Sequence, residues 1–149
     1  TQDSVFIPLS STEVVSAIDP NYMCCTFRGG LIALNTSNGD ERWKMHTVPE
    51  PKKIGYNSNR ISSWGPSGAP VWSTPTIDLE RGLIYIGVGQ NYSHPATELS
   101  DAIIAIGIES GSCADSCTEQ QYVESIERWE YTGNYVAEKW DGQTYLISE

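Results

Sequence analysis

The sequence predicts an all-β chain that forms two to three blades of a β-propeller. Three observations support this prediction: short β-rich runs recur between turn clusters, amphipathic helical periodicity is nearly absent, and one strand–turn–tryptophan pattern occurs twice. At roughly 40–50 residues per blade, a chain of 149 residues supplies only part of a closed propeller. We therefore expect one partial propeller over residues 1–149, with repeat units at about 5–43 and 83–129 and an inserted loop at 112–125.

The expected strands are short runs rich in β-branched and aromatic residues. The clusters TSNGD, GPSGAP and LERG separate them, and clusters of Gly, Pro, Asn and Ser are typical of turns. Short strands at this density favour a sandwich, a barrel or a propeller. The runs are SVFIPLS (4–10), GGLIALN (29–35), PVWSTPTID (70–78), GLIYIGVG (82–89), DAIIAIGI (101–108) and QTYLIS (143–148).

An internal repeat favours the propeller among these folds. The segment IALNTSNG at 32–39 recurs as IAIGIESG at 104–111, an offset of 104 − 32 = 72 residues. The first copy continues to Trp43 and the second, after the insertion, to Trp129, and an apolar strand precedes each copy. In a propeller blade such a turn would join two antiparallel strands, and the tryptophan would dock between neighbouring blades. The alternative is a chance similarity between two hairpins of a β-sandwich.

The charge balance excludes one broad class of function. Nine Lys and Arg stand against nineteen Asp and Glu, a formal net charge of -10, so no basic patch is available for a nucleic-acid backbone. No apolar run approaches the roughly 20 residues that a membrane-spanning helix needs. The chain starts at Thr1 without a signal-peptide pattern, so we expect a mature or excised product. The five Trp and eight Tyr could suit a carbohydrate-binding module, but no motif supports one.

The four cysteines fall into two pairs. Cys24 and Cys25 are adjacent, and a bond between neighbours closes a strained eight-membered ring, so either each pairs elsewhere or the pair is a strained, reactive feature. Cys113 and Cys117 lie in the polar insertion GSCADSCTE. We expect a disulfide between them that contributes about 2 kcal/mol to stability. An even count is compatible with an oxidising compartment.

Three stretches resemble a known family, the quinoprotein alcohol dehydrogenases. Residues 65–106, from GPSGAPVWSTPTID to SDAIIAI, resemble these propellers, which hold pyrroloquinoline quinone (PQQ) on their axis. The stretches CCTFRGGLIALN (24–35) and GQNYSHPATELSDA (89–102) look most like the polyvinyl-alcohol dehydrogenase branch. The resemblance covers about residues 5–111 and is loose beyond them. It implies a quinoprotein-type propeller with PQQ and calcium, an alcohol or polyol substrate, oxidation of hydroxyl groups that could belong to a polymer, and a periplasmic or secreted location.

The resemblance also implies roles for individual residues. VFIPLSSTE (5–13) matches a strand followed by a cofactor contact, here Ser10, and a calcium ligand, here Glu13. Calcium takes hard oxygen ligands and would polarise the quinone carbonyl that accepts hydride. Trp72 matches the tryptophan that stacks beneath the quinone. The alternatives are an exposed strand-end acid for Glu13 and an ordinary core position for Trp72.

Two further positions depart from the family pattern. Gln90 falls where the family has an asparagine metal ligand; the longer side chain changes the reach, and Asn91 is an alternative ligand. Glu138, in EKWD (138–141), aligns with the catalytic aspartate of the family. The resemblance implies that Glu138 takes the hydroxyl proton as hydride leaves for the quinone. The alternative for Glu138 is an exposed charged turn.

The adjacent cysteines lie on a segment that the family lacks. After the metal-binding glutamate the family turns quickly into an Arg-Gly pair, but here residues 14–27 are inserted before Arg28. We interpret Cys24–Cys25 as a replacement for the vicinal disulfide that covers the quinone in classical members. The alternative is that both thiols are reduced, or that they are cross-paired with Cys113 and Cys117.

A partial propeller also implies partners. Open sheet edges expose unpaired backbone groups, so the remaining blades must come from deleted sequence, from another chain or from self-association. The same edges would suit a non-catalytic, propeller-derived structural subunit in a larger assembly. This is the alternative to a PQQ-dependent alcohol dehydrogenase.

Overall fold

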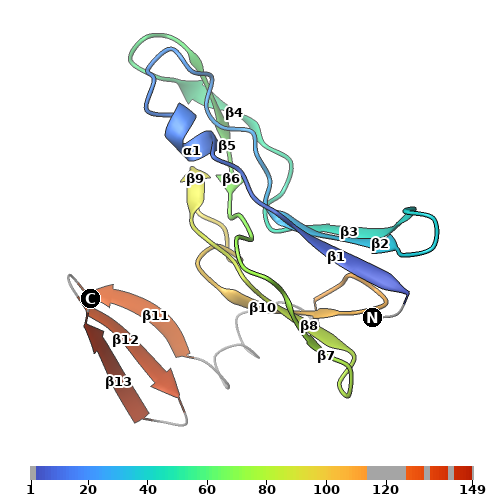
Figure 1. Ribbon diagram of the computed structural model, residues 1–149. Coiled ribbons are helices and arrows are strands. Elements are labelled where there is room, and N and C mark those ends of the chain that lie inside the picture. The colour runs from blue at the N-terminus through green and yellow to red at the C-terminus, as the bar shows by residue number, and fades with distance from the viewer. Residues whose placement is uncertain (1–2, 114–126, 133–134, 141–142, 149) are drawn as a thin grey trace. The chain divides into compact units, whose positions relative to one another are not determined.

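The computed structural model describes residues 3–113, 127–132, 135–140 and 143–148, and the side chains of residues 3–113 (Figure 1). The chain divides into two compact units, Thr1–Ala114 and Asp115–Glu149, which we describe separately. Within the described residues almost every element is a strand, and the helix α1 (Glu13–Ser16) has four residues. The prediction of an all-β chain is confirmed. No helix in this part of the chain is long and apolar enough to span a bilayer.

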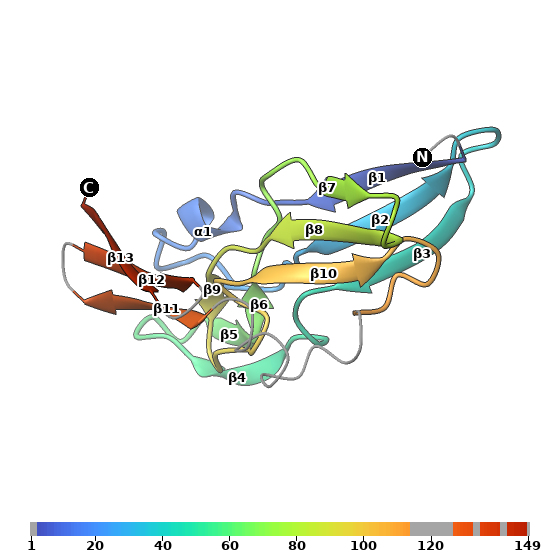
Figure 2. The same ribbon diagram turned by 90° about the horizontal axis from the view of Figure 1, so that it is seen from below.

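Two three-stranded antiparallel sheets form the main part of the first unit, and two strand pairs accompany them. Figure 2 shows the two larger sheets side by side. Their strand orders are β1-β2-β3 and β10-β8-β7. The elements are β1 (Ser4–Leu9), β2 (Gly30–Asn35) and β3 (Glu41–His46); β7 (Thr76–Asp78), β8 (Leu83–Gly87) and β10 (Ile103–Gly107); and the pairs β4 (Lys52–Tyr56) with β5 (Ser62–Gly65) and β6 (Ser67–Gly68) with β9 (Asn91–Ser93).

The core of the first unit comes from alternate residues of the predicted strands. Side chains in a strand point alternately to opposite faces, so apolar residues two apart share a buried face. In β10, Ile104 and Ile106 lie opposite Ile86 and Ile84 of β8. All four are at most 1% exposed, as are Leu31 and Ala33 of β2. This alternation explains why the strand predictions for these segments are correct.

The two copies of the sequence repeat fold into the same turn. The Gly39 N–H donates to the Asn35 carbonyl at 2.8 Å, and the Gly111 N–H donates to the Gly107 carbonyl at 3.0 Å. Both turn-ending glycines have positive φ, 78° at Gly39 and 64° at Gly111, which side chains with a Cβ rarely adopt. The repeat therefore reflects a repeated hairpin geometry.

Strand pairing beyond the turn repeats as well. Leu34 pairs with Glu41, and Ile106 forms an isolated antiparallel bridge with Cys113. Both residues of the second pair lie 72 positions after those of the first (106 − 34 and 113 − 41). The second copy thus begins the same return strand at Cys113, which lies within the loop predicted over residues 112–125.

Trp43 docks on the turn of the second repeat, as predicted. Its indole N–H donates to the Ile108 carbonyl at 2.9 Å. The ring lies against Gly111, where an added Cβ would be 2.5 Å from the Trp43 Cδ2. Arg42 adds an ion pair with Glu109 at 2.9 Å. The equivalent Trp129 lies in β11, and its side chain is outside the described part.

The strand predicted over residues 70–78 is too long. Only Thr76–Asp78 (β7) is a strand, because Pro70 and Pro75 cannot donate to a sheet ladder. Upstream, Ala69 has a positive φ of 47° and Val71 donates its N–H to the Leu9 carbonyl at 2.9 Å. This irregular segment places Trp72 outside a strand.

The second unit is a three-stranded antiparallel sheet in the order β11-β12-β13. Its strands are β11 (Glu127–Thr132), β12 (Tyr135–Trp140) and β13 (Gln143–Ser148). The predicted strand QTYLIS is confirmed as β13. Glu138 lies within β12 and pairs with Tyr145, so the alternative that places Glu138 in a turn is wrong.

Candidate functional site

Backbone hydrogen bonds bring together three segments that carry predicted site residues. The irregular segment 69–72 is bonded to the end of β1, where the Val71 N–H donates to the Leu9 carbonyl at 2.9 Å. It is also bonded to the segment before β9, where the Ala69 N–H donates to the Gln90 carbonyl at 2.8 Å. Since all these partners are main-chain groups, the arrangement does not depend on a ligand.

Ser10, Trp72 and Gln90 lie on these neighbouring segments, and all three are exposed. Trp72 is 58% exposed, so it does not belong to the core of this chain. A tryptophan buries 150–250 Å² when it is fully packed, so leaving one open at this point is energetically unfavourable. An exposed indole on a segment bonded to two others that carry polar residues fits one wall of a site for a planar molecule.

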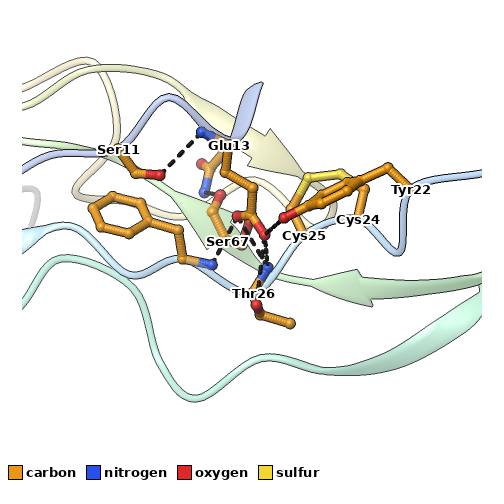
Figure 3. Close-up of a disulfide and its surroundings, with 9 residues drawn as sticks. Ser11, Glu13, Tyr22, Cys24, Cys25, Thr26 and Ser67 are labelled. Carbon is orange, nitrogen blue, oxygen red and sulfur yellow. Dashed lines mark hydrogen bonds between the residues drawn. A yellow bond between two sulfur atoms is a disulfide. The ribbon is translucent and has the colours of Figure 1, made fainter. Parts of the chain in front are cut away.

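The carboxylate of Glu13 is buried within the first unit. It is only 8% exposed, so the alternative of an exposed strand-end acid is wrong. Figure 3 shows its carboxylate among residues of the inserted segment. Oε1 accepts hydrogen bonds from the Tyr22 hydroxyl at 3.1 Å and the Thr26 N–H at 2.9 Å. Oε2 accepts from the Thr26 N–H at 3.1 Å and the Phe27 N–H at 2.8 Å.

The adjacent cysteines form a disulfide with each other across a cis peptide bond (Figure 3). The alternatives of reduced or cross-paired thiols at Cys24 and Cys25 are therefore wrong. The backbone on both sides is fixed to β5: the Trp64 N–H donates to the Cys24 carbonyl at 2.7 Å, and the Cys25 N–H donates to the Trp64 carbonyl at 3.3 Å. Cys113 is also disulfide-bonded, whereas Cys117 lies outside the described residues.

Two tyrosine hydroxyls near Glu13 are held in the neutral form. Burial raises the pKa of Tyr22, and the hydrogen bond to Glu13 and the charge of that carboxylate raise it further. Burial also raises the pKa of Tyr92, with a smaller contribution from Glu13. Tyr92 donates its hydroxyl to the Ser11 carbonyl at 2.7 Å and stacks on Phe27 with ring centroids 6.0 Å apart. Both phenols therefore remain hydrogen-bond donors at neutral pH.

The oxygen atoms around Glu13 do not fit a resident calcium ion. A carboxylate offers about four lone-pair sites, and Glu13 already accepts five hydrogen bonds, from the Tyr22 hydroxyl, the Thr26 N–H (shared by both oxygens), the Thr26 hydroxyl and the Phe27 N–H. The Asn91 amide oxygen already accepts from the N–H and hydroxyl of Thr97 at 3.0 and 3.1 Å. No group of three or more His, Cys, Asp or Glu that could hold a metal occurs within the described residues. Metal binding by Glu13 and Gln90 stays a prediction that this geometry does not favour.

An open hollow of about 590 Å³ lies elsewhere on the first unit, and no predicted site residue lines it. Burial lowers the pKa of His46, with smaller contributions from the charges of Arg28 and Lys44, so the ring is neutral at pH 7. Arg28 pairs with Glu50 at 2.8 Å. The lining residues are Arg28, Lys44, His46, Thr47, Val48, Pro49, Ala96, Thr97, Glu98 and Leu99.

Glu138 cannot be joined to this geometry. It belongs to the second unit, and its side chain lies outside the described part of the chain. Its catalytic role stays a prediction.

Comparisons with known proteins identify the relatives of the chain. No protein-family profile matches it. The chain is 39% identical over 111 residues to a polyvinylalcohol dehydrogenase from Pseudomonas sp., a match that covers 74% of this chain and 17% of that protein. It is 38% identical over 109 residues to a polyvinylalcohol dehydrogenase from Sphingopyxis sp. (strain 113P3), with 72% and 17% covered. The chain is a homologue of the polyvinylalcohol dehydrogenases.

The resemblance to the polyvinyl-alcohol dehydrogenase branch is thereby confirmed, and the chain spans 17% of the length of these dehydrogenases. Among solved structures, a quinohaemoprotein alcohol dehydrogenase from Pseudomonas putida HK5 aligns with a TM-score of 0.49 and 18% identity. That alignment covers 98% of this chain and 23% of the other.

Proposed function

We propose that the chain forms part of a PQQ-dependent alcohol dehydrogenase propeller, which oxidises hydroxyl groups, including those of a hydroxylated polymer, in the periplasm or outside the cell. The homology to polyvinylalcohol dehydrogenases supports the reaction class. The observation that carries the proposal is the exposed indole of Trp72, on a segment that backbone hydrogen bonds hold beside the segments of Ser10 and Gln90.

Each residue of this wall has a distinct task in the proposal. Trp72 stacks against a face of the planar cofactor, a contact worth about 0.5–1.5 kcal/mol beyond area burial. Ser10 and Gln90, on the neighbouring segments, offer a hydroxyl and an amide to polar groups at the cofactor's rim. PQQ, when bound, supplies the acceptor for the hydride of the alcohol.

Proton removal is assigned to Glu138 in this proposal. A carboxylate within hydrogen-bond reach of the substrate hydroxyl can take its proton as the carbon loses hydride. We derive no step through calcium, because the oxygens of Glu13 and Asn91 are already occupied by hydrogen bonds.

The rest of the propeller is proposed to come from sequence beyond this segment, from another chain or from further copies of this one. The chain spans 17% of its relatives, and β1 is an edge strand whose Val5 and Ile7 are 47% and 40% exposed. These apolar side chains equally suit the alternative function, a structural subunit without catalysis.

Binding of PQQ by the purified chain tests the proposal. Because stacking on Trp72 contributes about 0.5–1.5 kcal/mol, Trp72→Ala should raise the Kd for PQQ about 2- to 13-fold. Tyr56→Ala is the matched control, since Tyr56 is a similarly exposed aromatic residue at 65% and belongs to β4. If wild-type chain leaves the PQQ absorbance spectrum unchanged, or Tyr56→Ala weakens binding equally, the catalytic proposal is wrong and the structural subunit is preferred.

A further inference from the structure

We infer that Glu13 is the internal anchor of the loop that carries the Cys24–Cys25 disulfide, and that it holds this loop without a metal ion. The inference concerns the chain's own architecture. It goes beyond the proposed function and holds whether or not PQQ binds.

The contacts of Glu13 bracket the disulfide along the chain. Tyr22, which donates its hydroxyl to Oε1, precedes the cysteines by two residues. Thr26 and Phe27, which donate their backbone N–H groups, follow them directly. A single carboxylate thus fixes both ends of the stretch 22–26, which contains the disulfide (Figure 3).

Because Glu13 is buried, the hydrogen bonds to its carboxylate are important for stability. Among the described residues Glu13 is the one buried carboxylate, and none of the ion pairs in this part of the chain involves it. A buried carboxylate needs compensating donors, and two backbone N–H groups with a phenol supply them here. Its own N–H donates to the Ser11 hydroxyl at 3.0 Å, which fixes Glu13 at the start of α1.

The loop has other attachments besides Glu13, including the Gly68 N–H, which donates to the Phe27 carbonyl at 2.9 Å. Asn57 binds the Pro20 carbonyl at 2.7 Å through an exposed contact, and Trp64 binds the cysteine backbone. Neither reaches the N–H groups of Thr26 and Phe27. Removal of the Glu13 carboxylate would therefore leave these donors without the acceptor they have here.

A calcium ion at Glu13 would have to displace these donors. Calcium takes six to eight oxygen ligands, whereas the neighbours of this carboxylate are hydrogen-bond donors. The anchor and the metal site are thus competing assignments for one side chain, and they predict opposite responses to calcium.

The experiment compares how fast reductant opens the disulfide in three forms of the full chain: wild type, Glu13→Gln and Glu109→Gln. In Glu13→Gln the side-chain NH₂ group would face the backbone N–H donors of Thr26 and Phe27. Two donors cannot bind each other, so the substitution should loosen the loop. Glu109→Gln makes the same charge change at an exposed ion pair outside the loop. Thiols released by dithiothreitol are trapped by alkylation and assigned by peptide mapping.

We expect Cys24–Cys25 to be reduced about tenfold faster in Glu13→Gln, equivalent to about 1.4 kcal/mol, and at the wild-type rate in Glu109→Gln. The disulfide of Cys113 in the same sample is an internal control and should be unaffected, because Cys113 lies outside the loop. Amide exchange at Thr26 and Phe27 should accelerate in parallel. Equal reduction rates in Glu13→Gln and Glu109→Gln would overturn the inference.

A second variant and a calcium titration complete the test. If Glu13→Gln fails to fold, Tyr22→Phe removes one donor only and should give a smaller acceleration of about two- to fivefold; an unchanged rate would refute the anchor. Added Ca²⁺ should leave the melting temperature of wild type unchanged. A Ca²⁺-dependent rise that Glu13→Gln abolishes would show a metal ligand instead. Absence of PQQ binding would overturn the proposed function and leave this inference intact.

Discussion

The repeated turn provides a matched pair of substitutions, Gly39→Ala and Gly111→Ala, that tests how the two repeats pack. Both glycines end the same five-residue turn with positive φ, 78° and 64°. A Cβ at Gly39 would meet nothing within 4 Å, whereas a Cβ at Gly111 would lie 2.5–2.8 Å from three atoms of the Trp43 ring. The pair therefore separates the backbone cost from the cost of a clash between repeats.

The magnitude follows from these two terms. Alanine in the left-handed region costs about 1–2 kcal/mol, and both variants carry that cost. Overpacking of a fixed aromatic ring adds typically about 1–3 kcal/mol, and only Gly111→Ala carries this term. We expect Gly111→Ala to lower the free energy of unfolding by about 2–5 kcal/mol, against about 1–2 kcal/mol for Gly39→Ala.

The assay is urea unfolding followed by circular dichroism, with Trp43→Ala as a second background. Without the indole the added methyl at position 111 has room, so Gly111→Ala should then cost about as much as Gly39→Ala. Neighbouring residues that share a contact show such coupling of roughly 0.5–3 kcal/mol. Equal costs for the two glycines in wild type, or a cost at Gly111 that is unchanged by Trp43→Ala, would refute the docking of Trp43 on the second repeat.

Two further predictions concern pH and assembly. The folded-state pKa of His46 is lowered chiefly by burial, so its stabilising contribution is full above pH ~6.5 and is lost as pH falls through the folded-state pKa. Thermal melts between about pH 4 and pH 8 should show this acid loss reduced by His46→Gln but not by His94→Gln; identical profiles would contradict it. The open edge at β1, with exposed Val5 and Ile7, should drive association, which Ile7→Lys should weaken. A stable wild-type monomer at micromolar concentration in sedimentation would count against that prediction.

The strands could be predicted where apolar residues alternate and where the repeat aligns them. Leu31, Ala33, Ile104 and Ile106 are buried because they share faces two residues apart. The prediction failed over residues 70–78, because this run contains Pro70 and Pro75, which cannot donate to a sheet ladder and prevent regular pairing. The docking of Trp43 was predictable because the turn and its tryptophan repeat in the sequence.

The surroundings of Glu13 could not be predicted in the same way. Its partners are mainly the backbone N–H groups of Thr26 and Phe27. Because every residue except proline has such a donor, the pattern of side chains in the sequence does not predict which ones bind the carboxylate. The resemblance suggested a metal ligand for this position, while the disulfide between Cys24 and Cys25 remained one of several pairings compatible with the sequence. Only the fold brings the carboxylate and the segment around the disulfide together.

The two features of the first unit that bear on function are held by different kinds of contact. The wall around Trp72 is held by main-chain hydrogen bonds from residues 69 and 71, so side-chain substitutions there should alter binding with little effect on its shape. The disulfide loop has the buried carboxylate of Glu13 in addition to its main-chain bonds to Trp64, so a substitution at Glu13 should loosen it. Since preorganised groups lose less entropy when a ligand binds, the wall is the part expected to retain affinity for a planar molecule when the loop is loosened. Combining Glu13→Gln with a measurement of PQQ affinity would separate the contribution of the loop from that of the wall.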